Sequence, residues 1–346
     1  MIPEPDSAPV FLSSAALSAK IRGCLLGGAL GDAAAAASGP ASASSTSITA
    51  DTQLALYSLD GLLEAIEWAN QGVGADETAC IWLAYLRWMR GRGLSLPENG
   101  PSPLPRPIDA EPLLQPAGTE GDADLDPDVL QALSTGEMGT RQRPLHTGVN
   151  TPAALVRSAP FGLLPYVQTE TVYKLALDAA SLTHGHPSAR HSAAVFASMV
   201  HGLLAPGATL RSAATEALAQ ARANGVPELA DRLQAVLDDD GGAGAAAAGT
   251  SGGTPTSEEA LAIGLHAAQA VEDAADAAPG DGNLSAATGA AIRDAATAGG
   301  TPAAVVTGSL LGTRYGTLPE TDLETLRERG VIEKLASGFV AATVAP

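Results

Sequence analysis

Residues 21–33 read IRGCLLGGALGDA and lie within a helical pattern that covers residues 18–37. Ile21, Leu25 and Leu26 recur at the spacing of one helix face. The glycines between them leave room for the backbone of another helix to come close. The stretch therefore predicts a helix that packs tightly against a second helix.

Apolar residues elsewhere in the chain follow the same helical spacing. They fall in three groups: Leu59, Leu62, Leu63 and Ile66; Phe196, Met199, Val200 and Leu203; and Ile332, Leu335, Ala336 and Phe339. A further helix, which contains Trp82 and Trp88, is predicted over about 76–91. The chain is rich in alanine and has only 3% aromatic residues, which favours helices over strands. No segment alternates as a strand does, and no internal repeat is visible, so we predict an all-α fold.

Two segments interrupt the helical pattern, and a third precedes it. Residues 1–15 contain three prolines and little periodicity, which predicts a flexible tail before a single helical domain over residues 16–346. Prolines and acids replace apolar residues over about 93–130, which indicates either an ordered cap or a flexible loop. A Gly/Ala/Thr/Ser-rich stretch at about 238–257 predicts disorder.

The formal net charge is −19, from 19 basic and 38 acidic side chains. An acidic surface repels phosphate backbones, so we expect no nucleic-acid partner. Cys24 and Cys80 lack the spacing of a zinc site or a disulfide framework. No signal peptide and no apolar run of about 20 residues is visible, which predicts a cytoplasmic protein without a membrane partner.

Two short motifs carry polar residues that could contact a ligand. Residues 48–56 read ITADTQLAL, in which Thr49 and Asp51 are typical of an ordinary helix N-cap. Residues 183–189 read THGHPSA, and the two histidines, His184 and His186, stand two positions apart. That spacing alone is weak evidence for a metal site. We give equal weight to a loop-capping role and to a ligand contact for these histidines.

These motifs resemble, in order and spacing, those of the ADP-ribosylglycohydrolase family. The resemblance also includes residues 148–164, GVNTPAALVRSAPFGLL, and residues 298–316, AGGTPAAVVTGSLLGTRYG, and it spans about 18–342. It implies a single orthogonal helical domain of the ADP-ribosylglycohydrolase type, with two loop insertions that are unmatched.

The family resemblance also implies a site for two magnesium ions, and the residues expected to bind them are largely absent. The family's Asp-x-Asp-Ser/Thr motif places its aspartates at Gly299 and Thr301, and its Thr-Asp-Asp-Thr-Gln motif places the first aspartate at Ala50. No acidic residue stands near Gly39, where the family usually has a glutamate. We therefore predict a degenerate metal site and no cofactor, with magnesium bound only if the site is rebuilt.

Remnants of this site remain in the chain. Thr49, Asp51 and Thr301 are the predicted metal-site remnants. The resemblance implies that Asp32 lies at the floor of the site and that Asn150 belongs to a loop that cradles ADP-ribose phosphates. The candidate ligand-binding residues are Asp32, Thr49, Asp51, Asn150, His184, His186 and Tyr315.

Three functional hypotheses follow from these residues. The first is a catalytically degenerate family member that binds ADP-ribose, another nucleotide-like ligand or a protein partner as a regulatory module. The second is an active hydrolase whose site is rebuilt around Asp32, Asp51, Asp294 or His184. The third is a structural partner protein, which an exposed apolar patch in place of the cleft would support.

Overall fold

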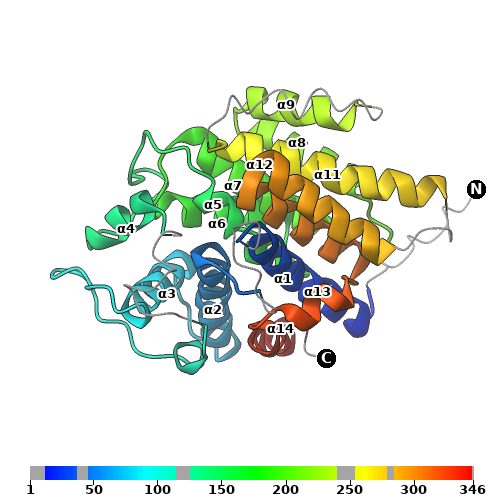
Figure 1. Ribbon diagram of the computed structural model, residues 1–346. Helices are drawn as coiled ribbons and strands as arrows, with labels where there is room; N and C mark the ends of the chain where they lie inside the picture. Colours follow the sequence, from blue (N-terminus) through cyan, green and yellow to red (C-terminus); the bar gives the residue numbers. More distant parts are fainter. Residues whose placement is uncertain (1–11, 37–45, 114–124, 240–253, 279–283, 345–346) are drawn as a thin grey trace, which may run out of the picture.

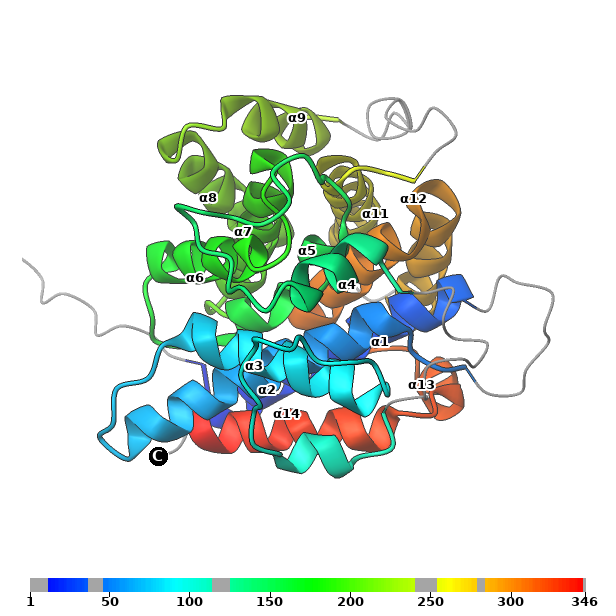
Figure 2. The same cartoon turned by 90° about the vertical axis from the view of Figure 1, so that its left-hand side faces the viewer.

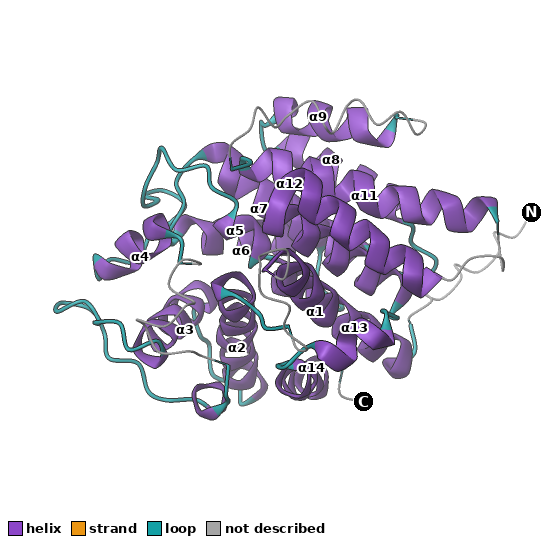
Figure 3. Cartoon of the chain, in the orientation of Figure 1, coloured by secondary structure: helices purple, strands orange, loops and turns teal. Residues whose placement is uncertain are grey.

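The computed structural model describes residues 12–36, 46–113, 125–239, 254–278 and 284–344. Within these ranges the chain is built from helices and contains no strand (Figures 1 and 3). One isolated bridge joins Thr46 to Leu326. The predicted all-α fold is therefore confirmed. No helix in the described ranges is long and apolar enough to cross a membrane.

The helices are mostly long, and several begin at a side chain that caps free backbone N–H groups. In chain order the longer helices are α1 (Ser14–Ala36), α2 (Ala50–Asn70), α3 (Glu77–Gly91), α4 (Pro127–Ser134), α6 (Thr169–Ser181), α7 (Pro187–Gly202), α8 (Leu210–Ala223), α9 (Pro227–Leu237), α11 (Ser257–Ala277), α12 (Leu284–Tyr315) and α14 (Arg329–Thr343). Short helical turns are η1 (Pro107–Ala110), α5 (Ala153–Val156), η3 (Ala159–Leu163) and α13 (Glu320–Thr325). Asp76 caps α3 and Thr209 caps α8, which shows why these helices begin where they do.

Two helices, α1 and α12, run antiparallel at the centre of the fold (Figure 1). Gly23 lies against Gly312, and Gly27 lies against Gly308, so closely that a Cβ on either glycine would collide with the opposite backbone. A glycine inside a helix lowers helix stability by about 1 kcal/mol relative to alanine. At these positions the close contact between the two helix backbones compensates for that loss. The predicted tight packing of residues 21–33 is confirmed.

A break divides α12 into two helical segments. Gly299 and Gly300 leave helical geometry, and Gly300 has a φ of 67°, in the left-handed region that favours glycine. Pro302 follows and starts the second segment. Because Gly31 of α1 lies against Ala304, this break lies beside the last turn of α1.

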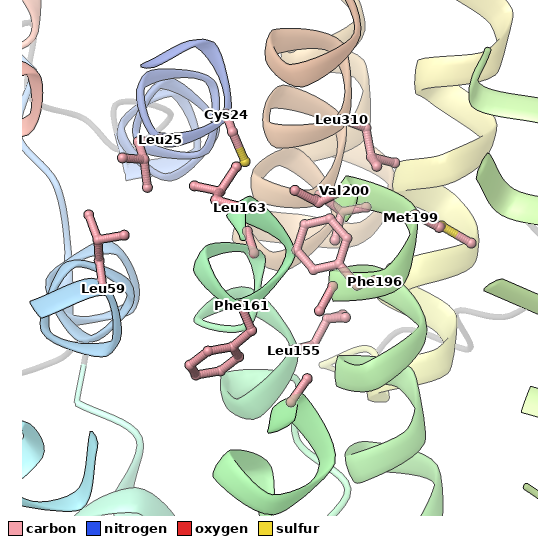
Figure 4. Close-up of a cluster of buried hydrophobic side chains, with 14 of the residues drawn as sticks. Cys24, Leu25, Leu59, Leu155, Phe161, Leu163, Phe196, Met199, Val200 and Leu310 are labelled. Atoms are coloured by element: carbon pink, nitrogen blue, oxygen red, sulfur yellow. The ribbon is translucent and has the colours of Figure 1, made fainter. Parts of the chain in front are cut away.

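The other helices surround this central pair. α11 packs on α12, and α7 packs against α6, α8 and η3. α2 and α3 form a separate pair below them, with α14 against α1 and α2 (Figure 2). The predicted apolar face of α7 is buried: Phe196 and Val200 lie on the side of Leu310 of α12 and Leu155 of α5, and Met199 points towards α11 (Figure 4).

The predicted tail of residues 1–15 includes residues that belong to helix α1. Helix α1 begins at Ser14, because the Ser13 hydroxyl accepts the backbone N–H of Ala16 at 3.2 Å and so starts the helix. Residues 1–11 lie outside the described part of the chain.

The first predicted insertion is packed where the structure describes it. Ile108 and Leu113 are 1% and 2% exposed, and helix α4 already begins at Pro127. Residues 93–113 thus form an ordered cap, while 114–124 lie outside the described ranges. In the second insertion, residues 240–253 lie outside them too. Helix α11 begins at Ser257 because Thr256 and Glu259 form a capping box there.

Candidate functional site

The carboxylate of Asp32 caps the N-terminus of α2. The side chain is 0% exposed and accepts three hydrogen bonds, from the Thr49 hydroxyl at 2.7 Å, the Thr49 N–H at 2.8 Å and the Thr52 N–H at 3.3 Å. Burial raises the pKa of Asp32, while the hydrogen bonds from Thr52 and Thr49 lower it. Asp32 therefore joins α1 to α2.

Thr49 is the N-cap residue of α2. Its hydroxyl accepts the N–H of Asp51 at 3.3 Å and gives its only proton to Asp32. Ala50 is 3% exposed, and Asp51 is half-buried at the start of the helix. Three predicted site residues, Asp32, Thr49 and Asp51, thus meet at one helix N-terminus.

The break in α12 brings Gly299 and Thr301 beside the last turn of α1, and the surroundings of Gly299 are apolar. Gly299 is buried, and a Cβ there would lie 2.8 Å from both Ala303 Cβ and Ile263 Cδ1. Ile263 and Ala303 belong to a small apolar cluster with Ala295. Any side chain at position 299 would meet this cluster before it reached solvent. Thr301 is half-buried.

His184 lies in a buried chain of hydrogen bonds. Its Nε2 is 2.8 Å from the Thr151 hydroxyl, which is 2.8 Å from a carboxylate oxygen of Asp126. Its Nδ1 is 2.8 Å from the Thr183 hydroxyl, to which Arg157 donates.

The groups at the two ends of this series of hydrogen bonds, Asp126 and Arg157, indicate where its protons lie. The Asp126 carboxylate can only accept, so Thr151 donates to it and must accept from His184 Nε2. Burial and the charge of Arg157 disfavour a second proton on the ring, so Nδ1 accepts the proton of the Thr183 hydroxyl, which itself accepts from Arg157. His184 is therefore neutral, with its proton on Nε2 and both ring nitrogens engaged.

The stability of the protein is expected to fall below neutral pH because of His184. Burial, Arg157 and His146 hold the pKa of His184 well below its usual value. The unfolded chain thus takes up the proton first, so this contribution is complete above about pH 6.5 and is lost as the pH falls below it. Between pH 7.5 and 5.5 we expect it to cost about 1 kcal/mol.

Urea denaturation of the wild-type protein and of His184→Gln, at both pH values, measures this contribution. The wild-type should lose about 1 kcal/mol more than the variant. An equal loss in both proteins would mean that His184 does not titrate as its surroundings require.

The remaining candidates lie apart from the α2 N-terminus or fill structural roles. His186 caps α7 by accepting the Ser188 N–H at 3.2 Å, which is the loop-capping role. The Asn150 carbonyl accepts the N–H of Ser257 at 3.2 Å, whereas its buried side-chain oxygen has no hydrogen-bond partner among the described residues. Tyr315 ends α12, about 20 Å from Thr301 at 1.5 Å per residue, so it does not line this site.

Four contributors to the His184 chain were not predicted as site residues: Asp126, Thr151, Arg157 and Thr183. The dipeptide Asp126-Pro127 carries a recognisable signal for a helix start, since aspartate caps and proline suits the first turn. Its contact with Thr151 is invisible in the sequence. Helix α5, which follows Thr151, contacts α2, α7 and α12 and so joins the two groups of residues.

Comparisons with known proteins agree on one family. The family model described as ADP-ribosylglycohydrolase matches residues 13–345. A solved structure titled "ADP-ribosylglycohydrolase-related protein complex" is similar to this chain, with a TM-score of 0.59 and 21% identity, covering 94% of this chain and 99% of that one. At that identity the likeness supports the fold. No curated protein matches the chain.

Proposed function

The chain belongs to the ADP-ribosylglycohydrolase family, and we propose that it has lost the di-magnesium site and acts as a non-catalytic binding or regulatory module. The observation that carries this proposal is the packing at Gly299. A position where the family resemblance places a metal-binding aspartate holds a glycine instead, pressed against Ile263 and Ala303. This apolar environment disfavours a charged, metal-binding side chain at position 299.

The oxygen donors near the α2 N-terminus do not fit a pair of magnesium ions. Magnesium requires near-octahedral oxygen ligands, with carboxylates to balance its charge. Asp32 already accepts three hydrogen bonds, and the Thr49 oxygen accepts the N–H of Asp51, so both groups are largely engaged within the protein. No group of three or more His, Cys, Asp or Glu side chains in the described ranges is placed to hold a metal. We therefore assign no hydrolytic step that runs through a metal.

Binding of a nucleotide-like ligand makes fewer demands than hydrolysis does. The unpartnered side-chain oxygen of Asn150 is an acceptor that a ligand hydroxyl or amino group could satisfy. ADP-ribose is the ligand that the family suggests first, and a protein partner is the other candidate. The net charge of −19 supports our prediction that the protein has no nucleic-acid partner, and a cytoplasmic location remains a separate prediction.

Thermal unfolding with ADP-ribose, measured with and without magnesium chloride, tests the proposal. A ligand that binds the folded state raises Tm, and the rise grows with the logarithm of its concentration relative to its Kd. We expect ADP-ribose to raise Tm equally in magnesium and in EDTA, and we expect Asn150→Ala to reduce the rise. A large magnesium-dependent stabilisation would contradict the loss of the metal site.

The alternative is an active hydrolase with a site rebuilt around Asp32, Asp51, Asp294 or His184. Asp294 is exposed on the first segment of α12, and His184 has both nitrogens engaged, so neither supports this alternative. Turnover of ADP-ribosylated protein or of O-acetyl-ADP-ribose would establish it. Asp32→Asn is the informative variant, because an amide oxygen still accepts both N–H groups and its NH₂ can donate to the Thr49 hydroxyl. Turnover that disappears in this stable variant would overturn our proposal.

A further inference from the structure

A groove lies between the C-terminal half of α2, the start of α3, and α6. Its volume is about 730 Å³. The floor is formed by Leu62, Ala65 and Ile66 of α2 and by Leu175 of α6. Leu62 lies 13 residues after Thr49, about 20 Å along the helix axis, so the groove is separate from the α2 N-terminus.

Apolar surface continues beyond the mouth of this groove. Ala69 lines it from an exposed position one turn after Ala65. Val73 is 47% exposed and directly precedes Gly74 and Ala75, which also line the groove. A hollow with an apolar floor and an apolar rim is typical of a surface that receives another chain.

Carboxylates stand on opposite walls of the groove. Asp76 and Glu77 lie at the start of α3, and Asp178 lies on α6. Three bases lie nearby: Lys174, which also lines the groove, Arg190, and Arg141, whose Nε is 3.3 Å from an oxygen of Asp178.

Burial raises the pKa of Asp178 and Asp76 adds to the rise, although Arg141, Lys174 and Arg190 lower it. A further positive charge between Asp76 and Asp178 would stabilise both carboxylates. The net charge of −19 also attracts cationic partners over a longer range.

We propose that this groove docks an amphipathic helix of a partner protein, with its apolar face on the α2–α6 floor and a Lys or Arg between Asp76 and Asp178. The stripe from Leu62 to Ala69 covers about two helical turns, which suits apolar anchors at i, i+3 or i+4, and i+7 of the incoming helix. The proposal stands whether or not a nucleotide binds elsewhere.

Fluorescence anisotropy with a labelled 18-residue amphipathic peptide of leucine and lysine tests the docking, using the full chain at 150 mM salt. Ala69→Lys places a long cationic side chain in the groove, and Ala219→Lys places the same side chain on the exposed face of α8. Both variants change the net charge equally, so a general attraction between peptide and protein weakens equally in both. We expect at least a tenfold loss of affinity for Ala69→Lys alone.

A second matched pair of variants tests the contribution of the Asp76 carboxylate. Asp76→Asn keeps an N-cap residue for α3, since asparagine caps as well as aspartate does, and removes one facing charge. Asp231→Asn removes a charge that is 73% exposed on α9. We expect a threefold or greater loss of affinity for Asp76→Asn and no change for Asp231→Asn.

Three results would overturn the docking proposal. They are equal binding by Ala69→Lys and Ala219→Lys, equal binding of a leucine–glutamate peptide, and no binding of the leucine–lysine peptide at 100 µM. Each leaves the ADP-ribose experiment unaffected, because Ala69 lies far from Asn150 in the His184 region.

Discussion

Gly27→Ala is expected to lower the free energy of unfolding by about 3 kcal/mol, or to prevent folding, because it forces apart the two central helices. The new Cβ would meet the backbone of Gly308, lying 2.6 Å from its carbonyl carbon. The position of the Cβ is fixed by the backbone of α1, and the carbonyl belongs to the backbone of α12, so neither atom can move aside as the end of a flexible side chain can. Relief requires α1 and α12 to separate along their whole contact. The loss should appear as a lower urea midpoint.

Gly338→Ala provides the matched control for Gly27→Ala. Gly338 lies in the interior of α14, and a Cβ there meets nothing within 4 Å. Alanine has the higher helix propensity, so this substitution should raise the free energy of unfolding by about 0.5–1 kcal/mol. The same substitution is thus expected to lower the free energy of unfolding at Gly27 and to raise it at Gly338. Equal effects at both positions would show that helix contact does not determine the outcome at Gly27.

Asp60→Ala is expected to lower the free energy of unfolding by about 3–5 kcal/mol. Asp60 and Arg87 are 3% and 2% exposed, and Arg87 donates to Asp60 between α2 and α3. Arg106, from the first insertion, lies 3.0 Å from the same carboxylate. Removing the carboxylate leaves a buried guanidinium without its main counter-charge and releases the insertion from α2.

The expected loss does not mean that the ion pairs are strongly stabilising. Burial raises the pKa of Asp60 even though Arg106 and Arg87 lower it, so desolvation outweighs the attraction of both arginines. The large effect arises because the variant leaves Arg87 buried without the carboxylate that it pairs with.

Asp231→Ala is the control for Asp60→Ala. The pair of Arg222 with Asp231 spans 3.2 Å, with side chains 42% and 73% exposed. An exposed pair of this kind contributes about 0–1 kcal/mol, so this variant should unfold almost as the wild-type does. Limited proteolysis should also cut the 94–113 segment faster in Asp60→Ala. A similar stability for the two variants would contradict a structural role for this cluster.

Much of the fold was predictable because helices are encoded locally. Phe196, Met199 and Val200 share one face through spacing alone, and that face is buried in the structure. The glycines of residues 21–33 predicted close packing, although not that Gly308 and Gly312 would be their partners. The start of α1 was misplaced because one serine hydroxyl, at Ser13, begins the helix.

The sequence by itself determined the helical class, the family motifs and the absence of acids at Ala50, Gly299 and Thr301, since these depend only on which residues stand at which spacing. Only the tertiary structure decided what the remaining polar groups do. Asp32 caps a helix that begins 18 residues later, and His184 contacts Thr151 across 33 positions. Such partners are chosen by how the helices pack, because a buried polar group must be satisfied by whatever donor or acceptor the fold brings to it.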